Sequence, residues 1–322
     1  MKHLLDDGRP LRTLVRSLRA NVSRFPVPGS RDAAGGPPPD VIWGDIRDPA
    51  AVTRLLQGAD LVFHLAAHAR AWAANPKDFE AINVEGTRNV ASAALTAGVR
   101  RVVHVSTELV DGDETLYQRS KRGAEQVVHQ YLARGGDAVI VRPTRVYGPG
   151  PLTPANSVTR IIALYRRGLF RLRIADGGAR ANYVYVDDVV DGLLAAAERG
   201  ARGAVYLLGG ENLSLEELTT LIAEVTGRRH GLWPVPRAIA RLVGAACELG
   251  GRLGIEPMIT RQWVTILTAD RPISSDAAVR ELAYHPRSAR DGIAATVAWP
   301  TSTPSSHGRG HVSERASVKR AP

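Results

Sequence analysis

Residues 106–121, STELVDGDETLYQRSK, contain a tyrosine and a lysine spaced for acid–base chemistry. Tyr117 and Lys121 stand four positions apart, so both side chains lie on one face if this segment is helical. A tyrosine hydroxyl titrates near ~10, and a phenolate base at neutral pH therefore needs roughly 4 kcal/mol of stabilisation. A nearby ammonium supplies part of that stabilisation. The spacing allows proton transfer, although a solvated tyrosine beside a lysine has the same spacing.

Two hydroxyl side chains precede this tyrosine. Ser106 and Thr107 follow the apolar run RVVHV (101–105), which is typical of a buried strand. The C-terminal ends of parallel strands form the edge at which ligands bind in open α/β sheets. A hydroxyl at that edge can hold a substrate oxygen while the tyrosine moves the proton. We therefore expect Thr107 to be the hydroxyl partner, with Ser106 as the second candidate.

The elements that would position these residues alternate along the first half of the chain. Short apolar runs alternate with longer helical patterns, which predicts a parallel sheet with crossover helices. The expected strands are 11–15, 41–43, 60–67, 101–107 and 138–143, and the expected helices follow Asp48 and cover 77–98 and 116–133.

In the second half of the chain, strands and helices alternate less regularly. A strand is expected to run into a helix over 182–199, and a capping box starts a helix at 213–227. Residues 234–254 are expected to be helical. The apolar positions of this helix have the spacing of a packing face rather than of a membrane anchor: Ile239, Leu242, Val243, Ala246 and Leu249. The tail 301–322 is expected to be disordered, because it has too few apolar residues to bury a core.

Composition excludes several classes of protein. The chain has 322 residues and a formal charge of +10, but its 42 Lys and Arg residues are scattered rather than gathered with aromatics. Nucleic-acid sites concentrate charge on one face, so no nucleic-acid partner is expected. Cys247 is the only cysteine, which fits a reducing compartment. Neither a signal peptide nor an 18-residue apolar stretch is present, so we expect a cytoplasmic protein without a membrane span.

Further stretches resemble, in order, the extended short-chain dehydrogenase/reductase family, also called the NAD-dependent epimerase/dehydratase family. The resemblance spans about residues 4–299. Within the family, the sequence is most similar to the branch of 3β-hydroxysteroid dehydrogenases and dihydroflavonol reductase-like enzymes. The matching stretches are GDIRDP (44–49), DLVFHLAA (60–67), NVEGTRNVASAA (83–94), RVVHVST (101–107), YQRSKRGAE (117–125), RPTRVYGPG (142–150), NYVYVDDVVDG (182–192) and AVRELAYHPR (278–287).

This resemblance implies an α/β fold with a Rossmann-type doubly wound parallel sheet. Residues 1–150 would form an N-terminally truncated dinucleotide-binding domain, and 151–300 a smaller substrate-binding region from which 182–199 returns to the core. It also allows a homodimer, because relatives often dimerise through helices equivalent to 77–98 and 116–133.

The resemblance also implies residue roles. Tyr117 would be the general acid/base, Thr107 its hydroxyl partner, and Lys121 would hold the nicotinamide ribose and lower the pKa of Tyr117. Asn83 would have a supporting role, or it would be an N-cap or helix-kink residue. The remaining cofactor contacts would be Asp45 and Ile46 at the adenine, Leu65, Ala66 and Ala67 along the cofactor, and Pro143 and Val146 beside the nicotinamide.

The form of the cofactor and the reaction are narrowed by particular residues. Arg16 follows the strand 11–15 and could pair with a 2′-phosphate, which favours NADP over NAD. Sugar-nucleotide 4,6-dehydratases carry Asp-Glu after the threonine, whereas this chain has Glu108 and Leu109 there, which disfavours dehydration. Redox of a secondary alcohol or ketone remains, as does epimerisation, on a steroid-, terpenoid-, flavonoid- or sugar-like small molecule. His64 and His68 are expected to be structural rather than metal ligands.

Two departures from the family pattern concern the cofactor and the site. No glycine-rich turn precedes the strand 11–15, so the strands 11–15 and 60–67 are expected to lack a shared neighbour. Either the recorded start is too late, the interpretation that we favour, or the chain is a remnant with impaired cofactor binding. The connection from Thr107 to Tyr117 is also short. The alternative function is therefore a non-catalytic, degenerate binding protein of the same family.

Overall fold

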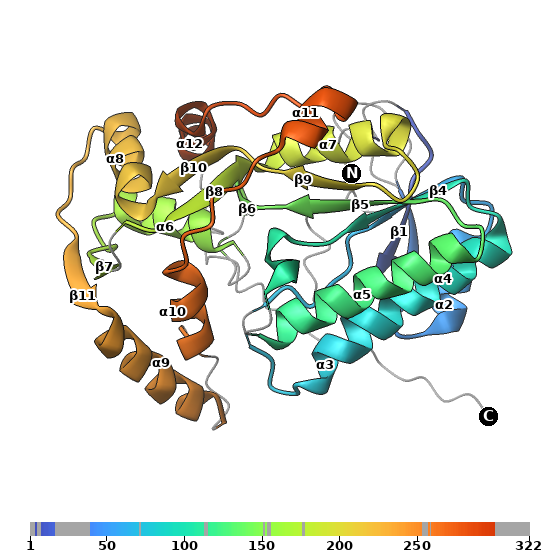
Figure 1. The fold of residues 1–322 in the computed structure, drawn as a ribbon, viewed down its shortest axis with the longest axis horizontal. Coiled ribbons are helices and arrows are strands. Elements are labelled where there is room, and N and C mark those ends of the chain that lie inside the picture. The colour runs from blue at the N-terminus through green and yellow to red at the C-terminus, as the bar shows by residue number, and fades with distance from the viewer. Residues whose placement is uncertain are drawn as a thin grey trace, which may run out of the picture.

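The computed structural model describes residues 4, 8–16, 39–70, 72–112, 115–150, 152, 156–175, 178–252, 257 and 259–299. The remaining residues, which include 17–38 and the predicted disordered segment 301–322, lie outside the described residues. A central parallel sheet and a second group of smaller sheets lie side by side along the longest axis of the molecule (Figure 1).

The main sheet has four parallel strands in the order β3–β4–β5–β9. These strands are β3 (Leu61–His64), β4 (Arg101–Val105), β5 (Ala138–Pro143) and β9 (Val205–Leu208). Helices cover both of its faces: α4 (Gly86–Ala97) and α5 (Leu116–Ala133) lie on one, and α7 (Val186–Arg199) lies on the other (Figure 1). The predicted doubly wound α/β fold is therefore confirmed.

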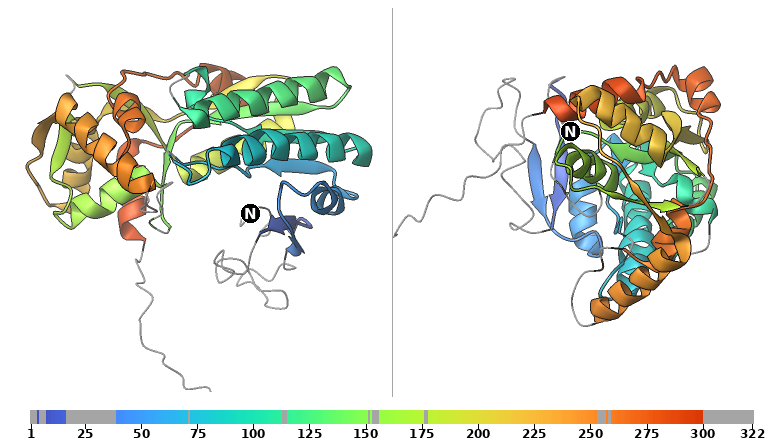
Figure 2. Two further views of the ribbon diagram at one scale, coloured as in Figure 1. Left: turned by 90° about the horizontal axis from the view of Figure 1, so that it is seen from below. Right: turned by 90° about the vertical axis from the view of Figure 1, so that its left-hand side faces the viewer.

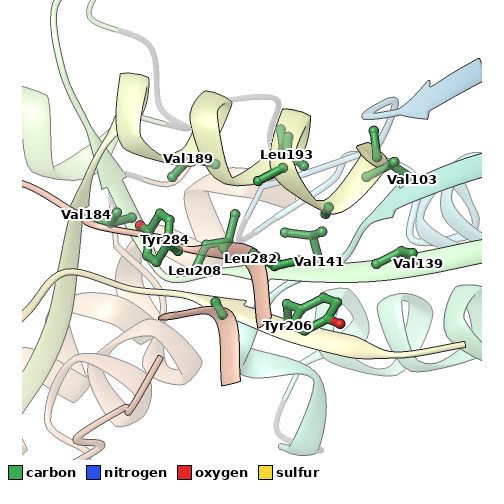
Figure 3. Close-up of a cluster of buried hydrophobic side chains, with 14 residues drawn as sticks. Val103, Val139, Val141, Val184, Val189, Leu193, Tyr206, Leu208, Leu282 and Tyr284 are labelled. Atoms are coloured by element: carbon green, nitrogen blue, oxygen red, sulfur yellow. The ribbon is translucent and has the colours of Figure 1, made fainter. Parts of the chain in front are cut away.

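Alternate residues of the strands supply the two cores of this sheet. Val102 and Ile140 pack toward α4 and α5, whereas Val103 and Val141 pack toward α7. Figure 3 shows the second cluster, in which side chains from β4, β5, β9 and α7 meet Leu282 of α11 (Asp276–Leu282). Strands buried on both faces read as continuous apolar runs, and this explains the pattern of 101–105 and 138–141 in the sequence.

A separate two-stranded parallel sheet contains β1 (Arg12–Val15) and β2 (Asp40–Trp43). It is attached through α2 (Pro49–Leu56), because Arg12 Nη1 donates hydrogen bonds to the carbonyl oxygens of Leu55 (3.1 Å) and Gln57 (2.7 Å). Among the described strands, β1 pairs only with β2 and β3 pairs only with β4, as expected for strands that lack a shared neighbour. Figure 2 shows this small sheet beside α2, apart from the main sheet.

The segment 77–98, which was expected to be one helix, is continuously helical to Ala97 but changes its hydrogen-bonding pattern along its length. A short turn, α3 (Lys77–Phe79), leads into a π-helical segment, η2 (Glu80–Glu85), and α4 follows. The π segment widens the helix at Asn83, a buried residue. Such bulges often occur at functional sites. The helix α5 has the predicted bounds and begins with a capping box between Thr115 and Gln118.

The smaller region contains two short sheets and several helices. One sheet has the order β10–β8–β6, and the other pairs β7 with β11. The elements are β6 (Arg145–Tyr147), β7 (Leu172–Ala175), β8 (Arg180–Tyr185), β10 (Glu211–Ser214), β11 (Trp233–Pro236), α6 (Ser157–Arg166), α8 (Leu215–Thr226), α9 (Arg237–Arg252), α10 (Arg261–Leu267) and α12 (Ala289–Ala298). In the part of the chain that the structure describes, no helix has the length and apolar character needed to cross a membrane.

The prediction for 234–254 is wrong in one respect. The helix α9 exists, but the apolar stripe expected to pack is turned outward, with Leu242 70% and Leu249 62% exposed. The inward face consists of small residues, Ala240, Gly244 and Gly251, all of which are buried. A Cβ atom at Gly244 would approach Arg261 N to 2.8 Å, so a small residue is needed where α9 meets α10.

Candidate active site

The candidate proton-transfer residues meet where β4 ends and α5 begins. Thr107 follows β4 and is buried, and Tyr117 and Lys121 lie on the first turns of α5. The Thr107 side chain lies close enough to the Tyr117 hydroxyl to lower its pKa. Lys121 is buried, and its Nζ donates a hydrogen bond of 2.6 Å to the carbonyl oxygen of Val105. The structure thus brings the three predicted residues together.

Burial controls the protonation of this group. Burial raises the pKa of Tyr117, the Thr107 side chain lowers it and the nearby Glu108 carboxyl raises it, with a net value of about 12. Burial also lowers the pKa of Lys121 to about 8, against the effect of Glu125. At neutral pH the protein on its own therefore holds a neutral phenol beside a lysine that is mostly charged.

A network of buried side chains supports the first turn of α5 from below. Asn83 Nδ2 donates to Ser120 Oγ (2.8 Å), and Ser120 Oγ donates to the carbonyl oxygen of Tyr117 (2.8 Å). Asn83 Oδ1 accepts a hydrogen bond from the backbone N–H of His68 (2.7 Å). Asn83 therefore links the loop after β3 to the turn that carries Tyr117. Sequence reasoning placed Asn83 in a supporting role but gave no signal for Ser120, which lies 37 residues away.

Two histidines lie beneath the same helix. His64 Nε2 is hydrogen-bonded to Thr87 Oγ1 (2.9 Å), and its ring centroid is 5.2 Å from that of His104. Both rings are buried, and neither ring nitrogen of His104 has a partner among the described residues. Burial lowers the pKa of His64 to about 3 and that of His104 well below its usual value, with Lys121 adding to both effects. Both rings are therefore neutral at physiological pH.

Glu108 lies near enough to Tyr117 for its charge to raise the pKa of the phenol. It begins the short 3-10 turn η3 (Glu108–Asp111), and burial raises the pKa of its carboxyl against the opposing charges of Arg145 and Arg271. Its Oε2 atom is buried without a partner among the described residues. The same residue lines an open hollow of about 530 Å³ together with residues 270–273. A protonated carboxyl group at this position can donate a hydrogen bond to a molecule bound next to Tyr117. In its ionised form the same group can accept a hydrogen bond from that molecule.

The residues predicted to contact the adenine end lie near the small sheet. Arg16 is exposed just after β1, and its charge, with that of Arg47, contributes to the lowered pKa of Asp45. Asp45 is held by Arg47, whose Nε and Nη2 atoms donate to the two carboxylate oxygens at 2.9 and 2.8 Å. Ile46 turns its side chain toward Gly86 on α4, where a Cβ atom would lie 3.0 Å away. Arg16 and Asp45 are therefore neighbours, and Ile46 joins the small sheet to α4.

The remaining predicted contacts follow the strands of the main sheet. Leu65, 57% exposed, comes directly after β3 and is followed by the small residues Ala66 and Ala67. Pro143 ends β5, and Val146 lies on β6. All of these positions lie at or beyond the carboxyl ends of parallel strands, the edge at which dinucleotides bind in this architecture. The exposed apolar surface after β3 suits a flat aromatic ligand.

The buried lysine provides a direct test of whether a dinucleotide fits. An ammonium group has three donors, and Lys121 directs one of them to the Val105 carbonyl. Its two further donors have no hydrogen-bond partner among the described residues, although Nζ is buried. Two ribose hydroxyls would satisfy them. The residues present therefore fit a dinucleotide whose nicotinamide ribose lies at Lys121.

The parallel sheet with polar side chains at its carboxyl edge defines a Rossmann-type α/β protein, and comparisons with known proteins agree. The sequence matches the NAD dependent epimerase/dehydratase family over residues 2–209. It is 32% identical over 306 residues to the 4-hydroxy-2-methyl-3-oxo-4-farnesyl-3,4-dihydroquinoline-1-oxide ketoreductase of Stigmatella aurantiaca, covering 87% of this chain and 86% of that protein. It is 30% identical to sterol demethylase protein B of Methylococcus capsulatus, with 80% and 83% covered.

A solved structure shows the same architecture. The crystal structure of gox2253 superposes with a TM-score of 0.73 at 31% identity and 92% coverage of both chains. The chain therefore belongs to the NAD-dependent epimerase/dehydratase family. Its relatives include dihydroflavonol reductase-like and 3β-hydroxysteroid dehydrogenase/decarboxylase proteins, which confirms the predicted branch.

Proposed function

We propose that this chain is an NAD(P)-dependent oxidoreductase or epimerase that acts on a secondary alcohol or ketone. The observation that carries this proposal is the meeting of the Thr107 and Tyr117 hydroxyl groups beside the buried Lys121. A bound nicotinamide cofactor would supply or accept the hydride at the substrate carbon. Lys121 would hold its ribose, and Leu65, Ala66, Ala67, Pro143 and Val146 would line its path.

The residues of the chain would manage the proton. In ketone reduction, Thr107 and Tyr117 both hydrogen-bond to the carbonyl oxygen, and the neutral Tyr117 phenol donates the proton. A pKa of about 12 keeps this phenol protonated at neutral pH, so the site is prepared for reduction. In alcohol oxidation the same hydroxyl must lose its proton first, and the charge on Lys121 stabilises the phenolate. Asn83 and Ser120 hold the Tyr117 backbone in place.

The class of substrate is inferred from the relatives and from the site. One relative is named as a ketoreductase of a farnesyl-bearing quinoline oxide and another as a sterol demethylase protein. These names favour a steroid- or terpenoid-like substrate and ketone redox, while flavonoid- and sugar-like substrates remain within the proposal. The exposed Arg16 near Asp45 favours NADP over NAD, because a guanidinium can pair with the 2′-phosphate.

A second candidate is a non-catalytic binding protein of the same fold. The observation that favours it is that, among the described residues, β1 and β2 form a sheet of their own. Arg16 and Asp45 therefore follow strands that do not pair with the main sheet. This candidate predicts impaired cofactor binding. The oxidoreductase predicts saturable binding and a tyrosine-dependent reaction.

The Tyr117→Phe variant tests the proposed role. It removes the transferred proton and keeps the ring, so NADPH-dependent reduction of a ketone panel (steroid, flavanone and bicyclic terpenoid ketones) should fall by about 10²–10⁴-fold. The affinity for NADPH should change by less than about twofold, because the Tyr117 hydroxyl contacts the substrate oxygen. Turnover equal to that of the wild type would exclude Tyr117 as the acid.

A further inference from the structure

The helix α9 presents its apolar side chains to solvent. Leu242 is 70% exposed, Leu249 62%, Ile239 49% and Val243 48%. These residues recur at spacings of three, four and seven, so they form one stripe along the helix. In Figure 1, α9 lies at the outer edge of the molecule, with α10 on its inner side. The stripe is therefore an uncovered apolar surface rather than part of the core.

The orientation of α9 is determined by its opposite face. Gly244 packs against the start of α10, where an added Cβ atom would come within 2.8 Å of Arg261 N and 2.9 Å of the Thr260 carbonyl carbon. A rotation that buried Leu242 would place a large side chain in this contact. The close packing of small residues therefore requires that the large apolar residues face outward.

Positive charge lies beside this stripe. Arg237 and Arg241 are exposed on one flank of α9, and neither has an ion pair among the described residues. The acidic residue on the same flank, Glu248, is paired with Arg261, whose Nη2 lies 2.8 Å from Glu248 Oε2. The surface around the stripe therefore keeps a net positive charge. Trp233, 74% exposed, precedes the helix on β11.

We propose that α9 is an interfacial helix by which this protein docks on an anionic lipid surface. An outward stripe of Ile, Leu and Val, flanking arginines and a neighbouring tryptophan are the features that place a helix in the plane of a lipid headgroup layer. A second copy of this chain is the less favourable occupant. A two-fold contact through α9 would place the arginines of both copies along the same interface, where like charges repel.

Vesicle co-sedimentation tests this proposal with the full chain. The wild type is expected to bind vesicles of equimolar phosphatidylcholine and phosphatidylglycerol more strongly than vesicles of phosphatidylcholine alone. The Leu242→Ser/Leu249→Ser variant should lower the partition coefficient by at least about tenfold, because two side chains no longer enter the apolar layer. The Arg237→Gln/Arg241→Gln variant should lower it by about tenfold on the anionic vesicles only.

Matched controls separate docking from general effects on the surface. Val279→Ser removes an exposed apolar side chain from α11, and Arg54→Gln/Arg134→Gln removes two exposed charges from the other end of the molecule. Both controls should bind vesicles like the wild type, and circular dichroism should show that all variants are folded. Absence of vesicle binding by the wild type would overturn the proposal, as would equal binding by the α9 variants. A dimer in sedimentation velocity that Leu242→Ser/Leu249→Ser dissociates, without vesicle binding, would instead assign the stripe to a second copy.

Discussion

The helices α5 and α9 have similar lengths but opposite relations to the rest of the protein. The 18-residue α5 buries Lys121 and Glu125 as well as its apolar side chains, whereas the 16-residue α9 buries glycine and alanine and exposes its leucines. Both sequences have a helical apolar period. The difference lies in what each helix packs against: α5 lies on a broad sheet and α4, and α9 lies on the short α10.

This difference separates two kinds of function. Burial on α5 raises the pKa of Tyr117, lowers that of Lys121 and keeps the histidines beneath them neutral, and strongly shifted pKa values of this kind cluster at functional sites. Exposure on α9 leaves its side chains chemically ordinary but available to a partner. We therefore propose a chemical function for α5 and a docking function for α9.

Of the changes that compare the two helices, Lys121→Met is expected to have the largest effect, because it removes the buried ammonium and keeps a similar side-chain shape. Turnover should fall by about 10²–10³-fold, because Tyr117 loses the charge that stabilises its phenolate. Cofactor affinity should also weaken, since the ribose loses its donors. Steady-state rates and a cofactor titration measure both effects, and the exposed Lys77→Met is the matched control. Unchanged turnover in Lys121→Met would show that the buried lysine of α5 has no part in the chemistry, and would contradict the functional difference proposed between α5 and α9.

Acid is expected to lower the stability of the folded protein through the two histidines beneath α5. His64 has a pKa of about 3 when folded and ~6.5 when unfolded, and His104 is shifted in the same direction. The unfolded chain therefore binds more protons below pH ~6.5, and stability falls as the pH decreases from there toward about 3. His64 contributes a slope of up to about 1.4 kcal/mol per pH unit inside that window, and His104 acts in the same direction.

Urea unfolding of the wild type and of His104→Leu at several pH values measures this contribution. The leucine fills a similar volume and cannot take up a proton. Its stability should therefore fall less steeply than that of the wild type as the pH decreases below ~6.5. Equal slopes for the two proteins would show that His104 is not held neutral by burial.

The smallest effect comes from the same substitution made on each helix. Val128→Ala on α5 removes methyl groups from a side chain that is 3% exposed and should cost about 2 kcal/mol of unfolding free energy. Val243→Ala on α9, at 48% exposure, should stay within about 0.5 kcal/mol, and the higher helix propensity of alanine acts in its favour. Chemical denaturation compares the two. Similar costs would mean that the stripe on α9 is buried in solution.

The sequence predicted the elements of the main sheet well, because their signals are local. The run 138–143 and the helix 116–133 have the predicted bounds, because the pattern of apolar residues marks both elements. The orientation of α9 depends on tertiary packing instead. The inward face of α9 follows from Gly244, whose close contact with α10 leaves no periodic signal.

The site shows the same division between local and tertiary signals. The four-residue spacing of Tyr117 and Lys121 was visible, but the sequence around Lys121 is polar and indicates an exposed helix face rather than a buried ammonium. The burial of Glu108 and the bond from Asn83 to Ser120 join segments that are distant or irregular in the sequence. The separation of the small sheet, in contrast, could be predicted because strands 11–15 and 60–67 lacked the strand that would join them.

Equilibrium titration of the folded protein with NADPH and with NADH, followed by tryptophan fluorescence, tests the central claim most directly. The account predicts saturable binding of both cofactors, tighter for NADPH, because Lys121 has donors for the ribose and Arg16 can pair with the 2′-phosphate. Absence of saturable binding by either cofactor, in a sample that circular dichroism shows to be folded, would contradict the oxidoreductase and favour the non-catalytic protein.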